Sequence, residues 1–426
     1  MGLDNIGVVG LGYVGLPTAL AFHDAGMRVT GIDVSEKVIQ SLKNGRCHLI
    51  DDTESIDIPT ESRRWRVCSD FNSVGDLDVI LITVPTPVSD DKKPDLSYVK
   101  SASKSVLENL KKDSNTIVVL ESTVYPGVTR AILGGICDDL GLRQGVDVTL
   151  AYCPERIDPG TAMRVGNISR VVGCDDPVIG SDLADIYGKT TIAQSTYVGV
   201  MEVAEAAKMV ENLQRDIDIA LVNELSKVFP KIGVDTEDVL DASATKWNFR
   251  RFKPGIGVGG HCIPVDPYYY IQIARDNGIE SQLALSARQV NESMPYESAL
   301  RISKIIGKGN VLILGYAYKE NLGDTRETPV EHLSDALIDL GIGISIWDPI
   351  VQPGDIPGRF ETILNLEDAP PVDMIVLSTA HQTILEIDWD WLKTITECSV
   401  IFDGRRALNK KKMIADGWEY SGVGAP

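Results

Sequence analysis

The sequence of 426 residues is poor in histidine and in aromatic residues, and it has no excess of basic residues. The five histidines are scattered and no Cys/His spacing resembles a metal site, so we expect no bound metal. The 61 acidic residues outnumber the 41 basic ones, which gives a formal net charge of −20. This balance argues against a nucleic-acid partner, because such a surface needs clustered Lys and Arg. Any anionic ligand must instead meet local cations.

Paired cysteines and long apolar runs are also missing. The seven cysteines are an odd number without a C-x-x-C pair, in a chain too long to need disulfides, which favours a reducing compartment. No apolar stretch approaches the length that spans a membrane, and the N-terminus lacks the basic region of a signal peptide. We therefore expect a soluble cytoplasmic protein without a membrane partner. Its length and its 43% hydrophobic content predict two or three globular domains.

Glycine is densest in the segment 253–266, which carries Cys262 beside Asp266. Glycine removes side chains where a backbone must bend sharply or approach a ligand, and the flanking prolines stiffen the ends of the segment. The pattern therefore predicts a loop rather than a helix or strand. Such a loop can present a thiol as a nucleophile. The alternative is a tight packing loop with a buried, apolar cysteine.

The first part of the chain has the pattern of a dinucleotide-binding domain. Residues 6–9 read as a short buried strand, followed by Gly10, Gly12 and Gly15 and by a helical pattern over 16–25. In such a turn the glycines permit the bend, the approach of a pyrophosphate and the packing of the helix on the strand. The helix N-terminus then faces the anion.

The second strand supports this interpretation. Residues 28–33 end in Asp33, at the distance from the glycine turn where a carboxylate accepts hydrogen bonds from the adenosine ribose. A carboxylate there would repel a 2′-phosphate. The sequence therefore predicts NAD, in preference to NADP, as the cofactor; the alternative is a βαβ turn that binds no nucleotide.

Alternating strand and helix patterns continue beyond this point. The predicted strands are 78–84, 116–121 and 146–152. This alternation predicts a doubly wound parallel sheet, which binds ligands beyond the carboxyl ends of its strands. Thr123 and Glu155 follow two of these ends and are candidate site residues. The alternative for Glu155 is an exposed carboxylate paired with Arg156.

A helical pattern from 202 to about 229 contains neither Pro nor Gly and is long enough to bridge two domains or join two subunits. Lys208 and Asn212 are four residues apart, so they share one face and could both point at one ligand oxygen. Alone, such a pair is more typical of a solvated face.

A second α/β alternation follows a helical stretch at 280–292. Its predicted strands are 310–315, 342–348, 373–379 and 399–403, without the dinucleotide glycine pattern. Lys319, Arg326 and one of Arg405 or Arg406 follow strand ends, where they would meet a nucleotide diphosphate. Surface ion pairing is the alternative for each. The predicted fold is α/β, with two doubly wound Rossmann-like domains, 1–198 and 301–426, joined by a long central helix and a helical dimerisation region, 199–300.

Together these motifs resemble the nucleotide-sugar 6-dehydrogenases, a family that oxidises UDP-glucose, GDP-mannose or UDP-N-acetylhexosamines. The resemblance covers nearly the whole chain and rests on 10–15, Glu121-Ser122-Thr123, Pro154-Glu155-Arg156, 205–212, 259–262, 323–326 and 402–406. It implies a UDP-sugar substrate, NAD and a homodimer or dimer of dimers. Val265 stands before Asp266, where the UDP-glucose and GDP-mannose branches have Lys, so the loop is similar to the N-acetylhexosamine branch. UDP-N-acetyl-D-mannosamine is the first candidate; UDP-N-acetylgalactosamine, UDP-N-acetylglucosamine and UDP-glucose stay open.

The resemblance also implies roles. Cys262 would attack the aldehyde, Lys208, with Asp266 or a water as relay, would take the hydroxyl proton, and Asn212 would stabilise the oxyanion. Glu155, with Thr123 orienting water, would hydrolyse the thioester. The NAD contacts are Gly10, Gly12, Tyr13, Val14, Gly15, Asp33, Thr86, Thr123 and Arg326. The substrate contacts are Glu155, Arg156, Lys208, Asn212, Arg250, Arg251, Gly259, Lys319, Arg405 and Arg406. Arg250 or Arg251 resembles an arginine that enters the partner subunit's sugar site, and His261 is expected to be structural.

Two rival hypotheses remain. A β-hydroxyacid or 6-phosphogluconate type of dehydrogenase shares the first domain and the long helix, but it needs neither the cysteine nor the basic loops of the last domain. A sensor of NAD or nucleotide sugars would keep the sites without turnover. The intact set of predicted catalytic residues argues against a sensor.

Overall fold

The computed structural model describes residues 3–49, 56–89, 93–156, 165–260 and 262–426. They form two compact units, each built on one sheet. The first unit extends to Glu211 and also takes Tyr268–Gly278, whereas the second holds Asn212–Pro267 and Ile279–Pro426. The predicted α/β fold with two Rossmann-like sheets is confirmed, while the division into three domains stays a prediction.

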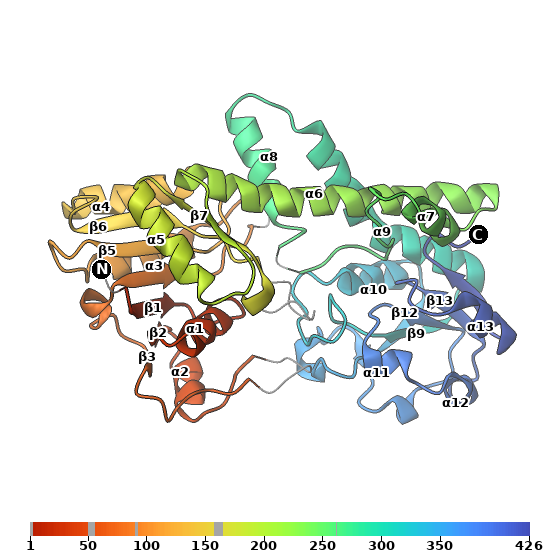
Figure 1. Cartoon of the computed structure of the whole chain (residues 1–426). Coiled ribbons are helices and arrows are strands. Elements are labelled where there is room, and N and C mark those ends of the chain that lie inside the picture. Colours follow the sequence, from red (N-terminus) through yellow and green to blue (C-terminus); the bar gives the residue numbers. More distant parts are fainter. Residues whose placement is uncertain (1–2, 50–55, 90–92, 157–164, 261) are drawn as a thin grey trace. The chain divides into compact units, whose positions relative to one another are not determined.

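The first unit contains an eight-stranded sheet in the order β3-β2-β1-β4-β5-β6-β7-β8 (Figure 1). The strands β1 to β6 are parallel, but β7 runs antiparallel to β6, a reversal that the sequence did not predict. The strand bounds are β1 (Asn5–Val9), β2 (Arg28–Ile32), β3 (Trp65–Cys68), β4 (Val79–Ile82), β5 (Thr116–Leu120), β6 (Val148–Tyr152), β7 (Arg170–Cys174) and β8 (Ser195–Tyr197).

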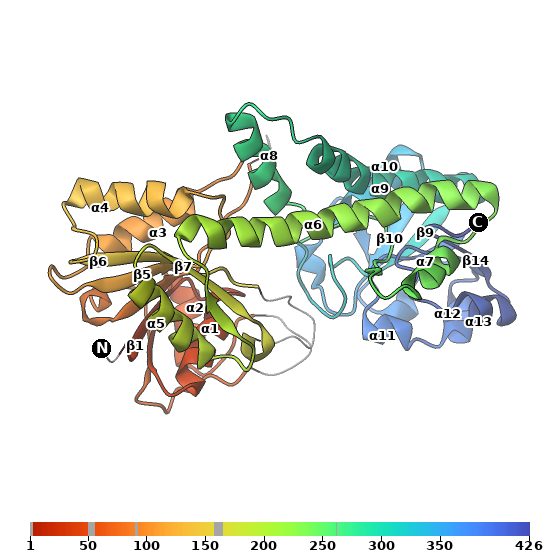
Figure 2. The same cartoon turned by 45° about the horizontal axis from the view of Figure 1, so that its top comes forward.

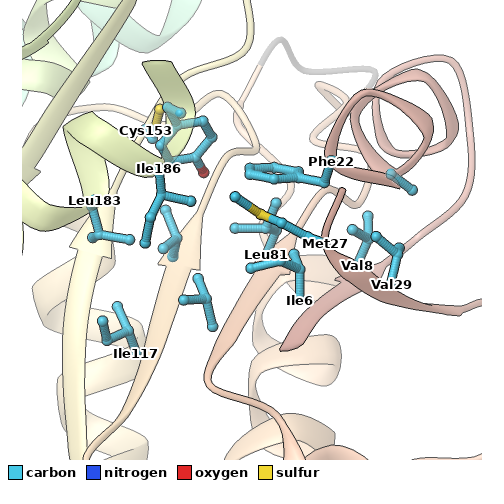
Figure 3. Close-up of a cluster of buried hydrophobic side chains, with 14 of the residues drawn as sticks. Ile6, Val8, Phe22, Met27, Val29, Leu81, Ile117, Cys153, Leu183 and Ile186 are labelled. Atoms are coloured by element: carbon cyan, nitrogen blue, oxygen red, sulfur yellow. The ribbon is translucent and has the colours of Figure 1, made fainter. Parts of the chain in front are cut away.

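Helices cover both faces of this sheet, which explains why β4, β5 and β6 are buried along their whole length. Apolar side chains of α1 (Gly15–Asp24), α2 (Glu36–Lys43) and α5 (Pro177–Gly188) pack on one face. Figure 3 shows part of this cluster, with Phe22 of α1 and Leu183 and Ile186 of α5 beside strand residues. On the other face lie α3 (Ser97–Leu107), the π-helix Thr129–Gly134 and α4 (Gly135–Leu140).

The second unit contains a parallel six-stranded sheet in the order β11-β10-β9-β12-β13-β14. The strand bounds are β9 (Asn310–Leu314), β10 (Gly343–Trp347), β11 (Glu361–Thr362), β12 (Met374–Leu377), β13 (Val400–Asp403) and β14 (Glu419–Gly422). Its core holds apolar side chains of α9 (Gln282–Ile306) and α10 (Pro329–Asp339) on one face, and of α11 (Gln382–Leu385), α12 (Trp389–Ile395) and α13 (Lys410–Ala415) on the other.

The remaining helices are α6 (Met201–Val228), α7 (Thr236–Ala244) and α8 (Asp266–Asp276). Figure 2 shows α6 as one continuous helix, as predicted. The helix predicted over 280–292 is wrong in length, because α9 continues through Pro295 to Ile306. The buried side chains of Ala299 and Ile302 favour this continuation, since they pack into the core of the second sheet. None of the helices in the described ranges is long and apolar enough to cross a lipid bilayer.

Candidate active site

The glycine turn between β1 and α1 has the shape that a pyrophosphate requires. Gly10 has a φ of +92°, and a Cβ there would lie 2.9 Å from the carbonyl oxygen of Thr83. A Cβ at Gly12 would have no described heavy atom within 4 Å, so the backbone there is open to a ligand. Helix α1 follows, and its N-cap residue Val14 provides no side-chain hydrogen bond. In the first turn the Leu16 amide donates to the Gly12 carbonyl at 3.1 Å and Pro17 has no N–H, so an anion would be met by the amides of the glycine turn itself.

Asp33 lies directly after β2 and is half-buried. One carboxylate oxygen accepts a hydrogen bond from the Leu11 amide at 2.8 Å, and the other accepts one from the Ser35 amide at 2.8 Å. The carboxylate therefore ties the glycine turn to the end of β2, at the place where a dinucleotide presents its ribose. The turn and the acid together fit NAD, and Tyr13 lies half-buried within the turn.

Further predicted residues follow neighbouring strands of the same sheet. Thr86 comes after β4, and its carbonyl accepts a hydrogen bond from the Tyr269 hydroxyl at 2.9 Å. Thr123 follows β5 and is half-buried, and Glu155 follows β6. Because β1, β2, β4, β5 and β6 are parallel, these residues and Asp33 share the carboxyl edge of the sheet. The strand order reverses between β1 and β4, where such sheets bind ligands.

Glu155 is buried against a buried arginine. Its carboxylate forms an ion pair with Arg170 of β7, and both side chains are at most 5% exposed. Glu155 also accepts a hydrogen bond from the Arg156 amide at 2.7 Å, and Arg170 donates to the Pro154 carbonyl at 3.4 Å. The alternative of an exposed Glu155 paired with Arg156 is wrong, because Glu155 is buried and the partner of its carboxylate is instead the buried Arg170 guanidinium.

Glu121, at the end of β5, is a second buried carboxylate beside Arg170. Its Oε1 accepts a hydrogen bond from the Tyr187 hydroxyl at 2.5 Å, while its Oε2 has no hydrogen-bond partner among the residues described. Burial raises the pKa of Glu121 to about 7, against the lowering effect of the Arg170 charge. The Glu155 charge adds to the rise. The cluster therefore holds two buried carboxylates, Glu121 and Glu155, around one guanidinium.

This arrangement predicts a pH-dependent stability. Below the ordinary pKa of 4.5 Glu121 is protonated in both folded and unfolded chains, whereas between 4.5 and about 7 only the unfolded chain ionises it. The contribution of Glu121 to folding stability therefore falls as pH rises through this window, and stays low above it. Glu121→Gln should unfold at a higher temperature than the wild type near pH 8, with a smaller difference near pH 5. Thermal unfolding at both pH values measures this, and a pH-independent difference would contradict it.

Two other predicted site residues of the first unit are not free surface groups: Arg156 is held by hydrogen bonds, and Lys208 is buried. Arg156 donates to Glu211 at 2.9 Å through Nε and to the Ser169 hydroxyl at 3.0 Å through Nη1. Its guanidinium is thus anchored within the unit. Lys208 lies on α6 and is 6% exposed, so the solvated-face alternative is wrong for this residue. A buried ammonium is typical of a site rather than of a solvated surface.

Cys262 lies half-buried just before α8, in the loop that the glycines predicted. Its carbonyl accepts hydrogen bonds from the amides of Val265 at 3.1 Å and Asp266 at 2.8 Å, so the cysteine ends the loop and the helix begins. The Asp266 carboxylate is 2% exposed and accepts a hydrogen bond from the Asn212 side chain. Asn212 thus holds Asp266, which stands four residues after Cys262. His261 lies outside the described residues.

The glycines of the loop are required by its packing. The Gly260 amide donates to the Arg326 carbonyl at 3.1 Å, and a Cβ at Gly260 would lie 2.6 Å from the Tyr318 ring. A Cβ at Gly259 would lie 2.7 Å from the Glu327 carbonyl oxygen. The loop therefore lies directly on the segment that follows β9. Its glycines allow a close backbone approach that larger residues would prevent.

The two neighbouring arginines after β13 have different surroundings. Arg405 is half-buried and donates to the carbonyls of Ser378 at 2.6 Å and Tyr318 at 3.3 Å. Arg406 has a φ of +50° and forms two hydrogen bonds with Asp235, at 2.9 and 3.0 Å. Since Arg406 is neutralised by a buried carboxylate, Arg405 is the better candidate for an anionic substrate.

The other predicted cations of the second unit also differ in whether a carboxylate holds them. Lys319 is half-buried in the loop after β9. Arg326 pairs with Asp324 at 2.5 Å, and Arg251 pairs with Glu237 at 2.6 Å, so each is held by a carboxylate. Arg250 is exposed. The roles predicted for all of these residues stay predictions.

Sequence patterns missed two residues that support the site. Arg170 is the first residue of an otherwise apolar strand, and its charge within such a run was the available signal. Asn223 is one polar residue among several on α6, and nothing in its local sequence marks it. No cluster of His, Cys, Asp and Glu suited to a metal ion occurs within the described ranges.

The two units together define an NAD-dependent oxidoreductase with a domain for a nucleotide ligand. The chain belongs to the UDP-glucose/GDP-mannose dehydrogenase family. The family's NAD-binding domain matches residues 4–191, its central domain residues 202–293, and its UDP-binding domain residues 312–410. NAD is thus the cofactor, and the last domain supports a UDP-sugar substrate.

Named relatives differ in the sugar that they oxidise. The chain is 35% identical to Protein CapL of Staphylococcus aureus, covering 96% of this chain and 97% of that protein. It is also 35% identical to the UDP-N-acetyl-D-glucosamine 6-dehydrogenase of Pseudomonas aeruginosa, covering 96% and 98%. A solved structure of UDP-N-acetyl-D-mannosamine dehydrogenase from Pyrococcus horikoshii matches with 30% identity and a TM-score of 0.85, covering 99% of both chains.

Proposed function

We propose that this protein oxidises the C6 hydroxyl of a UDP-N-acetylhexosamine to the carboxylate, with UDP-N-acetyl-D-mannosamine as the first candidate. The observation that carries the proposal is the cysteine loop, in which Asp266 stands four residues after Cys262 and accepts a hydrogen bond from the Asn212 side chain. A simple alcohol dehydrogenase needs no nucleophile, whereas a four-electron oxidation must retain the aldehyde. Val265 beside Asp266 supports an N-acetylhexosamine, as do the names of several relatives.

The chemistry divides among the chain's residues. Bound NAD supplies the hydride acceptor for each of the two oxidations. In the first, the C6 hydroxyl loses its proton; Lys208, with Asp266 or a water as relay, either accepts this proton or stabilises the charge that develops on the oxygen. The Cys262 thiolate then attacks the aldehyde carbon to give a thiohemiacetal, whose oxidation leaves a thioester. Lys208 and Asn212 donate hydrogen bonds to the oxyanion, and Glu155 takes a proton from the water that releases the uronate and the thiol.

The number of NADH molecules formed per sugar tests this proposal. UDP-N-acetylmannosamine, UDP-N-acetylgalactosamine, UDP-N-acetylglucosamine and UDP-glucose are compared with NAD in excess. Two NADH per sugar, with one epimer strongly preferred, are expected. One NADH would remove Cys262 from the mechanism, and no turnover with any of the four would contradict the substrate class.

We also propose that the protein is a homodimer or a dimer of dimers that pairs through α6. Val203, Val210, Leu221 and Val228 are each about half exposed. Their spacings of seven, eleven and seven residues place them on one narrow stripe of the helix. An exposed apolar stripe on a long helix suits a second copy of the same helix.

Activity should then depend on protein concentration. If Arg250, which is exposed, acts in the partner subunit's sugar site, dilution to the monomer should abolish uronate formation. Sedimentation at the concentration of the assay establishes the state of the protein. Full activity in a verified monomer would contradict this role for Arg250.

A further inference from the structure

Helix α6 presents a row of polar side chains on one face within the second unit. Asn212, Asp216 and Asn223 are separated by four and seven residues, so they fall within about 40° of one another around the axis. The exposed apolar stripe lies on the opposite side, about 180° away. Asp216 and Asn223 are at most 1% exposed. The polar face is therefore built into the unit rather than turned to solvent.

Two asparagines of this face hold the two ends of the cysteine loop. Asn212 donates to the Asp266 carboxylate at the C-terminal end, and Asn223 accepts a hydrogen bond from the Gly255 amide at the N-terminal end, at 3.0 Å. The asparagines are eleven residues apart, about 16 Å along the helix. The loop is thus fixed at both ends by one rigid element, with Cys262 between them.

The orientation of the Asn223 amide is set by a chain of hydrogen bonds. The Arg288 guanidinium donates to Asp216 Oδ1 at 2.6 Å, and Asn291 Nδ2 donates to the same oxygen at 2.7 Å. A carboxylate only accepts, so the Asn291 oxygen must face away, where it accepts from Asn223 Nδ2 at 2.9 Å. The Asn223 oxygen is then left to accept from Gly255. Asn291 Nδ2 also donates to the Asp216 carbonyl at 3.0 Å, so the two acceptors of Asp216 together determine which Asn223 atom meets the loop.

Burial makes this chain sensitive to any change in polarity. Arg288 and Asn291 are 3% and 1% exposed, so no member can exchange its partner for bulk water. A buried acceptor that faces another acceptor loses its hydrogen bond and repels its neighbour. Within the loop, Ile256 packs in the core and its amide donates to the Gly404 carbonyl at 3.2 Å, so the contact of Asn223 with Gly255 stands beside a fixed point.

We propose that Asn223 is a positioning residue for the nucleophile: through the Gly255 amide it sets the path of the loop that presents Cys262. The inference rests on the proposed function, because it assigns Asn223 to the reaction of Cys262. Asn223 is 1% exposed, and the two polar atoms of its side chain meet Asn291 and the Gly255 amide. We therefore expect its effect on catalysis to pass through the geometry of the loop.

Asn223→Asp tests the proposal with a side chain of the same size. Its second carboxylate oxygen would face the Asn291 oxygen, which Asp216 holds in place, so the chain must break. Misplacement of a reacting group by about 1 Å costs about a hundredfold in rate, and we expect kcat to fall by about ten- to a hundredfold. The Kd of NAD should stay within about twofold, and the sugar KM should change less than kcat.

Ser226→Ala is the matched control. The Ser226 hydroxyl is buried on the next turn of α6 and donates to the Asn223 carbonyl at 2.6 Å, without a contact to the loop. The kcat of Ser226→Ala shows how much activity is lost when one buried hydrogen bond on this helix is removed. A fall in kcat that Ser226→Ala reproduces would overturn the proposal.

Hydrogen exchange separates this inference from the proposed function, because it needs no substrate. Asn223→Asp should lose protection in the peptide 255–260 while the strands β9 and β12 keep theirs. Unchanged protection of 255–260 would overturn the positioning role even if kcat fell. Failure of the wild type on all four sugars would instead contradict the proposed function, and the exchange data would still decide the loop contact.

Discussion

Replacing Cys262 by alanine is expected to abolish uronate formation and to leave the binding of NAD and of the UDP-sugar intact. The thiol is the only group in the proposed mechanism that forms a covalent bond to the substrate carbon. Loss of such a nucleophile costs about ten-thousand-fold or more in kcat, since no neighbouring group replaces it. The measurement is uronate formed per enzyme under saturating NAD and sugar, with the Kd of each ligand determined by calorimetry.

The Cys262→Ala variant is expected to keep part of the reaction, which makes the result of this test more specific. Without the thiol, the first oxidation can still take place and release free aldehyde, so one NADH per sugar at a low rate is compatible with the mechanism. Cys47→Ala is the matched control, because Cys47 and Cys262 are half-buried whereas the other five cysteines are buried. Normal uronate formation by Cys262→Ala would remove the cysteine from the mechanism.

The sequence predicted those parts of the fold and of the site that depend on neighbouring residues. The glycine turn, Asp33 and the cysteine loop are local patterns, in which each residue acts on a backbone a few positions away. The buried strands β4, β5 and β6 were also evident, because parallel strands covered on both faces read as continuous apolar runs.

Features that depend on distant partners were not predictable in this way. The choice between Arg405 and Arg406 is decided by Asp235, which lies far away in the chain, and by the left-handed conformation of Arg406. The pairing of Glu155 with Arg170 requires β7 to return beside β6 in the opposite direction. Such contacts are set by tertiary packing, and the local periodicity of the sequence does not predict them.

The same distinction applies to α6. Its helical period predicted the shared face of Lys208 and Asn212, but not that Asn223, three turns further on, meets the loop at Gly255. That contact exists because α9 brings Asn291 against the helix. Local patterns thus predicted candidate reacting groups, whereas the residues that hold the loop became evident only from the tertiary contacts.

Glu155→Gln is expected to stop the reaction at the thioester. Glutamine has nearly the same shape and can still accept hydrogen bonds from the Arg156 amide and from the buried Arg170, so the site should keep its structure. It cannot take a proton from water. General-base catalysis contributes about a hundred- to ten-thousand-fold, and steady-state kcat should fall by that factor.

The accumulated intermediate gives the variant a signature that a misfolded enzyme cannot produce. Mixing it with NAD and the sugar should give a burst of two NADH per active site, followed by slow turnover. Intact-mass spectrometry should then show the chain plus the UDP-sugar less four hydrogens, attached at Cys262. The double variant with Cys262→Ala should show neither the burst nor the adduct.

Asp147→Asn is the matched control for loss of a buried carboxylate. Asp147 precedes β6, is buried and pairs with Arg143 at 2.9 Å, whereas Glu155 follows the same strand at its other end and pairs with Arg170. The control can lower stability, but its kcat per folded enzyme should stay near that of the wild type. Rapid steady-state turnover of Glu155→Gln without an adduct would assign the base to another residue. Absence of the burst would place Glu155 before the thioester, because the variant would then fail in an oxidation step rather than in hydrolysis.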